Sequence, residues 1–495
     1  MYRIKSIKLY FFSIFNLFFL NLKNFYFRSN FYNKRLISFI PDRIFYNPST
    51  YLSASLISTT SDFYKASTTT PEMLWKINSK DIKNFENLHG FLWLAKLDRK
   101  NSKIVTKNII KSWINNFFAY DPHTWEITTL SNRIIAWSSN TDITLEDSDR
   151  EYKEKFFLSI IKQSNFLVKN LNNLFYDSKK IICCSAIILS GMIFKDNDLH
   201  YKIGIRELEK TIKNYFDIDG FPKSRNPEEV FICIKYLVLI REWLKEAQKI
   251  IPDFLNEIII KSGNCYSILS CANKQFPLFN GATEINYNDY NIFLKNQKYK
   301  FISKEYEVAN LIKIKNKKLE FFIDCGNPPP NNYTKHYQAG CLSFELYSNK
   351  QKIICNSGYG KYLSQKFTSI SRSTAAHSTL YINDTSSCIF QKNYLINQVY
   401  GNSLVHEHKI INKNYTEDKN FYSISASHNG YEKIFGCTHK RSIKILKNED
   451  KILGQDEIKK GLNYLRPLTY CARFHIYPNT KIVKTNAGNA ILISL

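Results

Sequence analysis

The spacing of apolar residues changes once along this chain of 495 residues, and that change constrains the fold more than any other feature. Before about residue 270, apolar residues recur every three or four positions in segments separated by short polar or Pro/Gly breaks, which is typical of amphipathic helices. After about residue 276, they alternate with a period of two between turn residues, which is typical of strands. The predicted helices span residues 88–97, 104–118, 130–137, 153–171, 179–194, 203–216 and 227–249, and the predicted strands span residues 317–325, 341–347, 352–356, 378–382, 422–426 and 441–446.

This pattern predicts three regions in the chain. A series of antiparallel helices with short links indicates a helical bundle or toroid over residues 84–275. No helix-length apolar pattern separates the strands, so residues 276–495 are predicted to form a stack of antiparallel sheets. Residues 1–83 form a basic, aromatic extension. The last residues, AILISL, read as a strand, which indicates either a truncated sequence or a terminal strand.

Composition limits the classes of function. Apolar residues make up 44% and charged residues 23%, values typical of a globular protein rather than a disordered one. The formal net charge of +26 indicates a polyanionic partner, namely nucleic acid, an anionic membrane or an acidic polysaccharide, although a general Lys-rich composition explains it equally well. The sequence has no P-loop, GxGxxG, GxSxG or HExxH motif and no nucleic-acid-binding signature, so nucleic acid is not expected as a partner.

The N-terminal segment and the cysteines bear on localisation. Residues 5–22 have a basic start and an apolar stretch, the outline of a signal peptide, but Asn16 and Asn21 interrupt the stretch and no A-x-A site follows. An amphipathic helix that lies on the protein or makes peripheral contact with a membrane is the alternative. The eleven cysteines include no zinc-type pairs and are interpreted as mostly small buried residues, which fits a reducing compartment or an export route indifferent to thiols.

The most distinctive segment runs from residue 324 to 358. Three prolines, Pro328–Pro330, stiffen an extended loop, and His336 follows it just before a predicted strand. Asn356 lies at the next turn, and His377 enters the strand after that. Two histidines on neighbouring strands, with a polar residue between them, can converge on a metal ion or on an acidic group of a substrate.

These motifs resemble the C-terminal domain of the heparinase II/III family of polysaccharide lyases. The resemblance rests on H-x-x-A-G-x-L-S-F-E-L from His336, N-S-G from Asn356, and R-S-T-A-A-H-S-T-L from Arg372. Weaker matches upstream, at residues 133–137, 219–227 and 278–282, extend it to roughly residues 85–490. It implies an α+β multidomain chain, with an N-terminal (α/α) toroid of antiparallel helices followed by a C-terminal multi-layer antiparallel β-sandwich. It also implies β-elimination of uronic-acid polysaccharides in a cleft between the two domains.

β-Elimination needs three chemical contributions. The uronate carboxylate must be neutralised, a base must remove the proton on C5, and an acid must protonate the leaving oxygen O4. The resemblance implies these roles for particular residues: catalytic His336 and His377; substrate-binding Arg133, Trp137, Arg225 and Arg372; and a structural zinc ion held by His336, Asn356 and His377. Arg133 and Trp137 lie one helical turn apart, and a buried Trp with a capped Arg is the favoured alternative for that pair. Tyr359 is a further candidate proton donor.

Three departures from the family pattern leave an alternative open. Residues 334–336 stand where the family often has H-x-H, and we interpret His336 as the second of those histidines. Asn356 stands where the family has a zinc-binding Asp and is a poorer ligand. Residues 225–228 stand at the S-P-x-Y-H element and lack its Tyr. The leading hypothesis is therefore a lyase acting on an acidic polysaccharide of the cell envelope or periplasm, with the cytoplasm as the alternative location. The second hypothesis is a non-catalytic or biosynthetic cell-envelope polysaccharide-binding protein, and the third is a surface protein that binds anionic membranes through residues 5–30.

Overall fold

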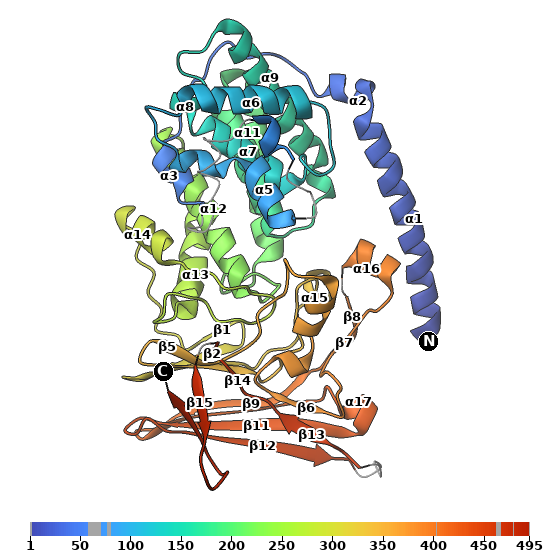
Figure 1. Cartoon of the computed structure of the whole chain (residues 1–495), viewed down its shortest axis with the longest axis vertical. Coiled ribbons are helices and arrows are strands. Elements are labelled where there is room, and N and C mark those ends of the chain that lie inside the picture. Colours follow the sequence, from blue (N-terminus) through green and yellow to red (C-terminus); the bar gives the residue numbers. More distant parts are fainter. Residues whose placement is uncertain are drawn as a thin grey trace.

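The chain folds into a helical half and a β half. The computed structural model describes residues 2–57, 71–76, 81–401, 403–461, 467–478 and 480–494. In Figure 1 the helices form the upper part of the molecule and the sheets lie in layers below them, with α1 along one side. The helices that precede the first strand are α1 (Tyr2–Arg28), α2 (Asn30–Arg35), α3 (Thr50–Ala54), α4 (Pro71–Leu74), α5 (Ile82–Gly90), α6 (Lys103–Phe117), α7 (Ile127–Ser138), α8 (Thr141–Thr144), α9 (Arg150–Asn170), α10 (Ser178–Ile193), α11 (Asp198–Tyr215), α12 (Pro227–Glu246), α13 (Asp253–Leu269) and α14 (Asn288–Asn296).

Helix α10 lies at the centre of the helical half. Its residues are apolar on nearly every side and almost all are buried, as expected for a helix surrounded by others. It contacts α7, α9, α11 and α12. Gly191 and Gly204 allow α10 and α11 to approach closely, because a Cβ atom at Gly191 would lie 2.2 Å from the backbone N of Tyr201. This packing positions Asp177, which caps the start of α10 by accepting a hydrogen bond from the backbone N–H of Lys180.

The β half is a stack of antiparallel sheets. The largest sheet has the order β1-β2-β3-β4-β5-β14, and the next has the order β12-β11-β10-β9. Smaller pairs are β13 with β6, β15 with β16 and β7 with β8. The strands are β1 (Glu307–Val308), β2 (Leu311–Lys315), β3 (Leu319–Asp324), β4 (Phe344–Ser348), β5 (Gln351–Cys355), β6 (Leu380–Ile382), β7 (Ile389–Phe390), β8 (Leu404–His406), β9 (Ile410–Glu417), β10 (Phe421–His428), β11 (Cys437–Leu446), β12 (Ile452–Lys460), β13 (Tyr470–Ala472), β14 (His475–Ile476), β15 (Lys481–Lys484) and β16 (Ile491–Ser494).

Two cores hold these layers together. Phe321 and Ile323 of the large sheet pack against Ile424 and Ile443 of the second sheet, which forms the sandwich core. Phe322, on the opposite face of β3, joins the core of the helical half. Alternate residues of one strand thus face different layers, as a two-residue period requires. The predicted toroid followed by a multi-layer antiparallel sandwich is confirmed.

Three further α-helices lie in connections between strands. They are the short helices α15 (Gln365–Ser371), α16 (Tyr394–Tyr400) and α17 (Glu432–Phe435). The last helix before the strands, α14, ends at Asn296, so the change from helices to strands comes after the predicted boundary at residue 275. No helix in the described part of the chain combines the length and the apolar character needed to cross a membrane. Ten of the eleven cysteines are buried, and Cys471 is exposed.

Candidate active site at the domain junction

His336 and Tyr359 face each other where the two halves of the molecule meet. Their ring centroids lie 5.1 Å apart. Both are fixed to the segment that follows the helical half, because the backbone N–H of Tyr359 donates to the carbonyl of Ala282 over 3.0 Å. A Cβ atom at Gly281 would lie 2.7 Å from the Cβ atom of His336, and Gly281 has φ +101°. A glycine is therefore needed for this close approach.

Positive charges surround this pair. Burial, together with the nearby charges of Lys335, Lys361, Arg372 and Lys179, lowers the pKa of His336 to about 3. The imidazole is therefore neutral at physiological pH and has a free electron pair. Burial raises the pKa of Tyr359, so its hydroxyl keeps its proton. A neutral acceptor and a protonated donor thus share a cationic environment, which suits an anionic substrate.

A half-buried carboxyl group, that of Glu229, forms part of a wall on the first turn of α12. The hydroxyl groups of Tyr215 and Ser224 both donate to Oε2 of Glu229. Burial raises the pKa of Glu229 to about 7, although both hydrogen bonds oppose the shift. The rings of Tyr215 and Tyr333 lie 5.7 Å apart, which brings this wall against the loop that carries His336. Glu229 was not predicted, and the only signal for it was the Glu228–Glu229 pair after the Asn226–Pro227 helix start.

His377 lies away from any surface that a polysaccharide could reach. Its side chain is buried, and burial lowers its pKa to about 3. It packs against Gly340, where a Cβ atom would lie 3.1 Å from its Cγ atom. The nearby Gln338 is also buried and donates from Nε2 to the carbonyls of Gly358 and Ser371 over 2.8 and 2.7 Å. This burial does not support the predicted catalytic role of His377 and indicates a role in the internal packing of the sandwich.

The residues predicted to hold zinc do not fit a zinc site. His336 pairs with Tyr359, on the junction side of the loop. The side-chain oxygen of Asn356 already accepts a hydrogen bond from the backbone N–H of Ser378 over 3.0 Å. Among the described residues, no group of three or more His, Cys, Asp or Glu side chains is arranged to hold a metal ion. One imidazole and a neutral amide fall short of the ligands that structural zinc sites use. These residues therefore do not form the predicted zinc site.

Arg372 positions the loop that carries His336. Its guanidinium is buried, donates to the carbonyls of Tyr337 and Thr334 over 2.8 and 2.9 Å, and lies over the ring of Phe390. These two carbonyls flank His336 along the chain. Arg372 therefore holds this loop in place, and the predicted substrate-binding role is not supported. Its charge still lowers the pKa of His336.

Arg225 joins the two halves of the molecule. Its buried guanidinium donates to the carboxylate of Asp324 and to the carbonyls of Ala309 and Asn327. A Cβ atom at Gly326 would collide with this guanidinium, so the glycine makes room for it. The predicted substrate-binding role is not supported, because these bonds within the protein engage the guanidinium.

Arg133 and Trp137 lie inside the helical half. Both side chains have an exposed fraction of 0%. The guanidinium of Arg133 donates to Gln163 over 2.7 Å and to the carbonyls of His89 and Thr124 over 2.9 and 3.0 Å. This burial contradicts the predicted role in substrate binding, and the structural alternative describes the pair correctly.

A cavity of about 790 Å³ opens beside the junction, between α15 and α16. Arg372 forms part of its wall, so it adjoins the loop that carries His336. Its other lining side chains are mostly polar and include Thr368, Ser369, Asp384, Gln391, Asn397 and Gln398. Hydroxyl and amide groups of this kind can hydrogen-bond to sugar hydroxyls.

Comparisons with known proteins agree with the motifs. Residues 301–495 match the family model described as heparinase II/III-like, C-terminal. A solved structure of heparinase III shares 15% identity at a TM-score of 0.62, covering 83% of this chain and 67% of that one. A mutant of the heparan sulfate lyase HepC from Pedobacter heparinus shares 13% identity at a TM-score of 0.58, covering 83% of this chain and 66% of that one. No curated protein sequence matches the chain.

These likenesses define the fold and identify one domain. The chain spans about two thirds of the length of the matched structures. At 13–15% identity, the structural match shows that the toroid and sandwich are shared. Residues 301–495 are thus similar to the heparinase II/III-like C-terminal domain, and the whole chain shares the fold of the heparinase III structures.

Proposed function

We propose that this protein is a polysaccharide lyase-like enzyme that cleaves an acidic, uronic-acid-containing polysaccharide by β-elimination. The observation that carries the proposal is the facing pair of His336 and Tyr359 within a group of cationic side chains at the domain junction. The heparinase II/III-like domain supports the same reaction class. The cavity beside Arg372 offers room for neighbouring sugar units.

Each residue of the pair has a role in the reaction. Lys335 and Lys361, both exposed beside the pair, neutralise the uronate carboxylate and make the C5 proton more acidic. His336 accepts that proton, and the electron pair of the C5–H bond forms the C4=C5 double bond. The C4–O4 bond breaks, and the hydroxyl of Tyr359 protonates O4. The bound carboxylate offsets the surrounding positive charge and so raises the pKa of His336 when it must hold the proton.

The test is ultraviolet absorbance of the unsaturated uronate product on a panel of acidic polysaccharides. We expect one member of the panel to give product, and H336A and Y359F each to lower kcat by about 10²–10⁴-fold, the usual contribution of general acid–base catalysis. Y470F is the matched control, because the side chain of Tyr470 is exposed and lies on β13 of the β half. Full activity in H336A would overturn the assigned base.

A second function is favoured by one specific observation. Glu229 follows Asn226–Pro227, at the element where the family has a tyrosine, and the predicted zinc ligands do not fit a metal site. A non-catalytic or biosynthetic polysaccharide-binding protein of the cell envelope would keep the cationic junction without the chemistry. Tight binding to one polysaccharide that K335Q and K361Q weaken, with no product from the wild-type protein, would favour this function over the lyase.

A further inference from the structure

Helix α1 stands beside the body of the protein (Figure 1). Near its C-terminal end, Phe27 packs on Phe166, and the hydroxyl of Tyr120 donates to Oδ1 of Asn24 over 3.0 Å. Further toward its start, α1 contacts α16. The less exposed residues, Ser13, Leu17, Asn24 and Phe27, share one face of the helix, because their spacing follows the helical repeat.

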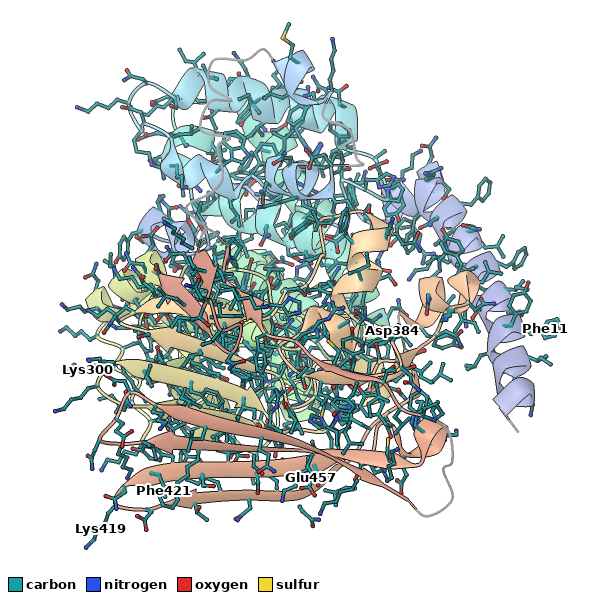
Figure 2. All side chains as sticks on the ribbon, turned by 60° about the horizontal axis from the view of Figure 1, so that its bottom comes forward. Phe11, Lys300, Asp384, Lys419, Phe421 and Glu457 are labelled. Atoms are coloured by element: carbon teal, nitrogen blue, oxygen red, sulfur yellow. The ribbon has the colours of Figure 1, made fainter. Side chains whose placement is uncertain are left out.

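The opposite face of α1 is apolar and exposed. Phe11, Phe15, Phe18, Leu22 and Phe25 recur at spacings of four and three residues and form one continuous stripe. Their exposed fractions range from 47% at Leu22 to 77% at Phe25. Figure 2 shows Phe11 pointing away from the rest of the molecule. Exposed contiguous apolar surface of this kind marks an interaction site.

The charged residues around this face of α1 are all basic. The first acidic residue of the chain is Asp42, whereas Lys8, Lys23, Arg28, Lys34 and Arg35 lie on α1 and α2. A helix with an aromatic face and basic residues but no acidic ones complements the surface of an anionic lipid bilayer.

The width of the apolar surface of α1 and the length of its uncharged run distinguish a helix lying on a membrane from a coiled-coil helix and from a membrane-spanning helix. The flanking residues Phe12, Ile14 and Phe19 are also exposed, so the apolar surface covers more of the helix than the narrow seam of a two-stranded coiled coil. The uncharged run, residues 9–22, has 14 residues, fewer than the roughly 20 that span a bilayer. We propose that α1 lies in the plane of an anionic phospholipid surface, with its outer face among the acyl chains and its basic residues at the phosphates.

Vesicle flotation tests this proposal on the full chain. We expect the protein to float with phosphatidylcholine–phosphatidylglycerol vesicles, less with phosphatidylcholine alone, and less in high salt. The variant F11Q/F15Q/F18Q should lose at least about tenfold in partitioning. The matched control I104Q/I218Q/I250Q removes three exposed isoleucines from the folded body and should partition like the wild type. Circular dichroism should show the wild-type helix content in both variants.

A fluorescent probe gives a second readout that does not depend on a triple variant. Because Cys471 is the one exposed cysteine of the eleven, the F11C/C471S variant can be labelled at residue 11 with an environment-sensitive dye. Anionic vesicles should shift its emission to the blue, and the I218C/C471S control should not shift. Equal flotation of F11Q/F15Q/F18Q and the wild type, or an unshifted probe, would overturn the proposal. A dimer that F11Q/F15Q/F18Q disperses, with no flotation, would assign this face to a second copy instead.

Discussion

Single residues at the junction have the environments that proton transfer requires. Glu229 is the clearest case, because two hydroxyl groups hold its carboxyl and burial raises its pKa to about 7. The group is protonated below that pH and charged above it. A charged Glu229 would repel an anionic substrate, whereas a protonated one can donate a hydrogen bond to it.

The affinity for substrate should therefore fall as pH rises through about 7. We expect KM to increase by roughly fivefold across this range, the effect of about 1 kcal/mol of charge repulsion. E229Q stays neutral and should show a flat KM profile, whereas E209Q, on the outer side of α11, should behave like the wild type. Measurement of KM between pH 6 and 8.5 checks this expectation. A KM that rises with pH in E229Q as it does in the wild type would contradict it.

At the scale of elements, strands β10, β11 and β12 share a row of buried polar side chains. The backbone N–H of Gly430 donates to Nδ1 of His428, so the proton of neutral His428 is on Nε2 and points to Nδ1 of His439. His439 then donates from Nε2 to Asp456, whose carboxylate also pairs with Arg441. The bonds accepted by Nδ1 of His428 and by Nδ1 of His439 both require a neutral imidazole.

This row predicts a loss of stability in mild acid. Burial lowers the pKa of both His428 and His439. A histidine with a lowered folded pKa contributes stability above its unfolded pKa of about 6.5, and that stability is lost as pH falls below this value, because the unfolded chain binds the proton first. The free energy of unfolding in urea should therefore fall between pH 7 and pH 5. H428Q should show a smaller fall, whereas an equal fall in both proteins would assign the effect to other buried groups.

The same strands show what could be predicted from the sequence and what could not. The apolar alternation was sufficient to predict residues 422–426 of β10 and the second part of β11, residues 441–446. The end of β10 and the start of β11 were missed because His428 and His439 are polar side chains that point inward, and only tertiary contacts satisfy them. β12 was missed because it is an edge strand with few buried residues, so no apolar period marks it.

At the scale of the whole molecule, the order of the two halves could be predicted because the apolar period changes between them. The candidate site could be predicted only in part. His336 lies in a distinctive motif, whereas Lys179 and Lys361 come near it only through the tertiary fold, and Glu229 is marked only by its contacts with Tyr215 and Ser224. The arginines were assigned to substrate because a guanidinium suits both a carboxylate ligand and an internal ion pair, and the residue type does not distinguish the two.

The Arg225–Asp324 ion pair should hold the two halves in one cooperative unit. Both side chains are buried, and Nδ2 of Asn280 also donates to Asp324, so removal of the guanidinium leaves a buried carboxylate without its charge partner. Loss of one member of a buried pair costs about 3–5 kcal/mol. We expect R225A to lower the thermal midpoint and to separate unfolding into two calorimetric transitions, whereas R206A, an exposed arginine on α11, should keep the wild-type profile. Because Arg225 touches the sandwich and not the facing pair, H336A should leave this profile unchanged. A single wild-type-like transition in R225A would mean that apolar contacts between the halves, such as those of Phe322, unite them without the ion pair.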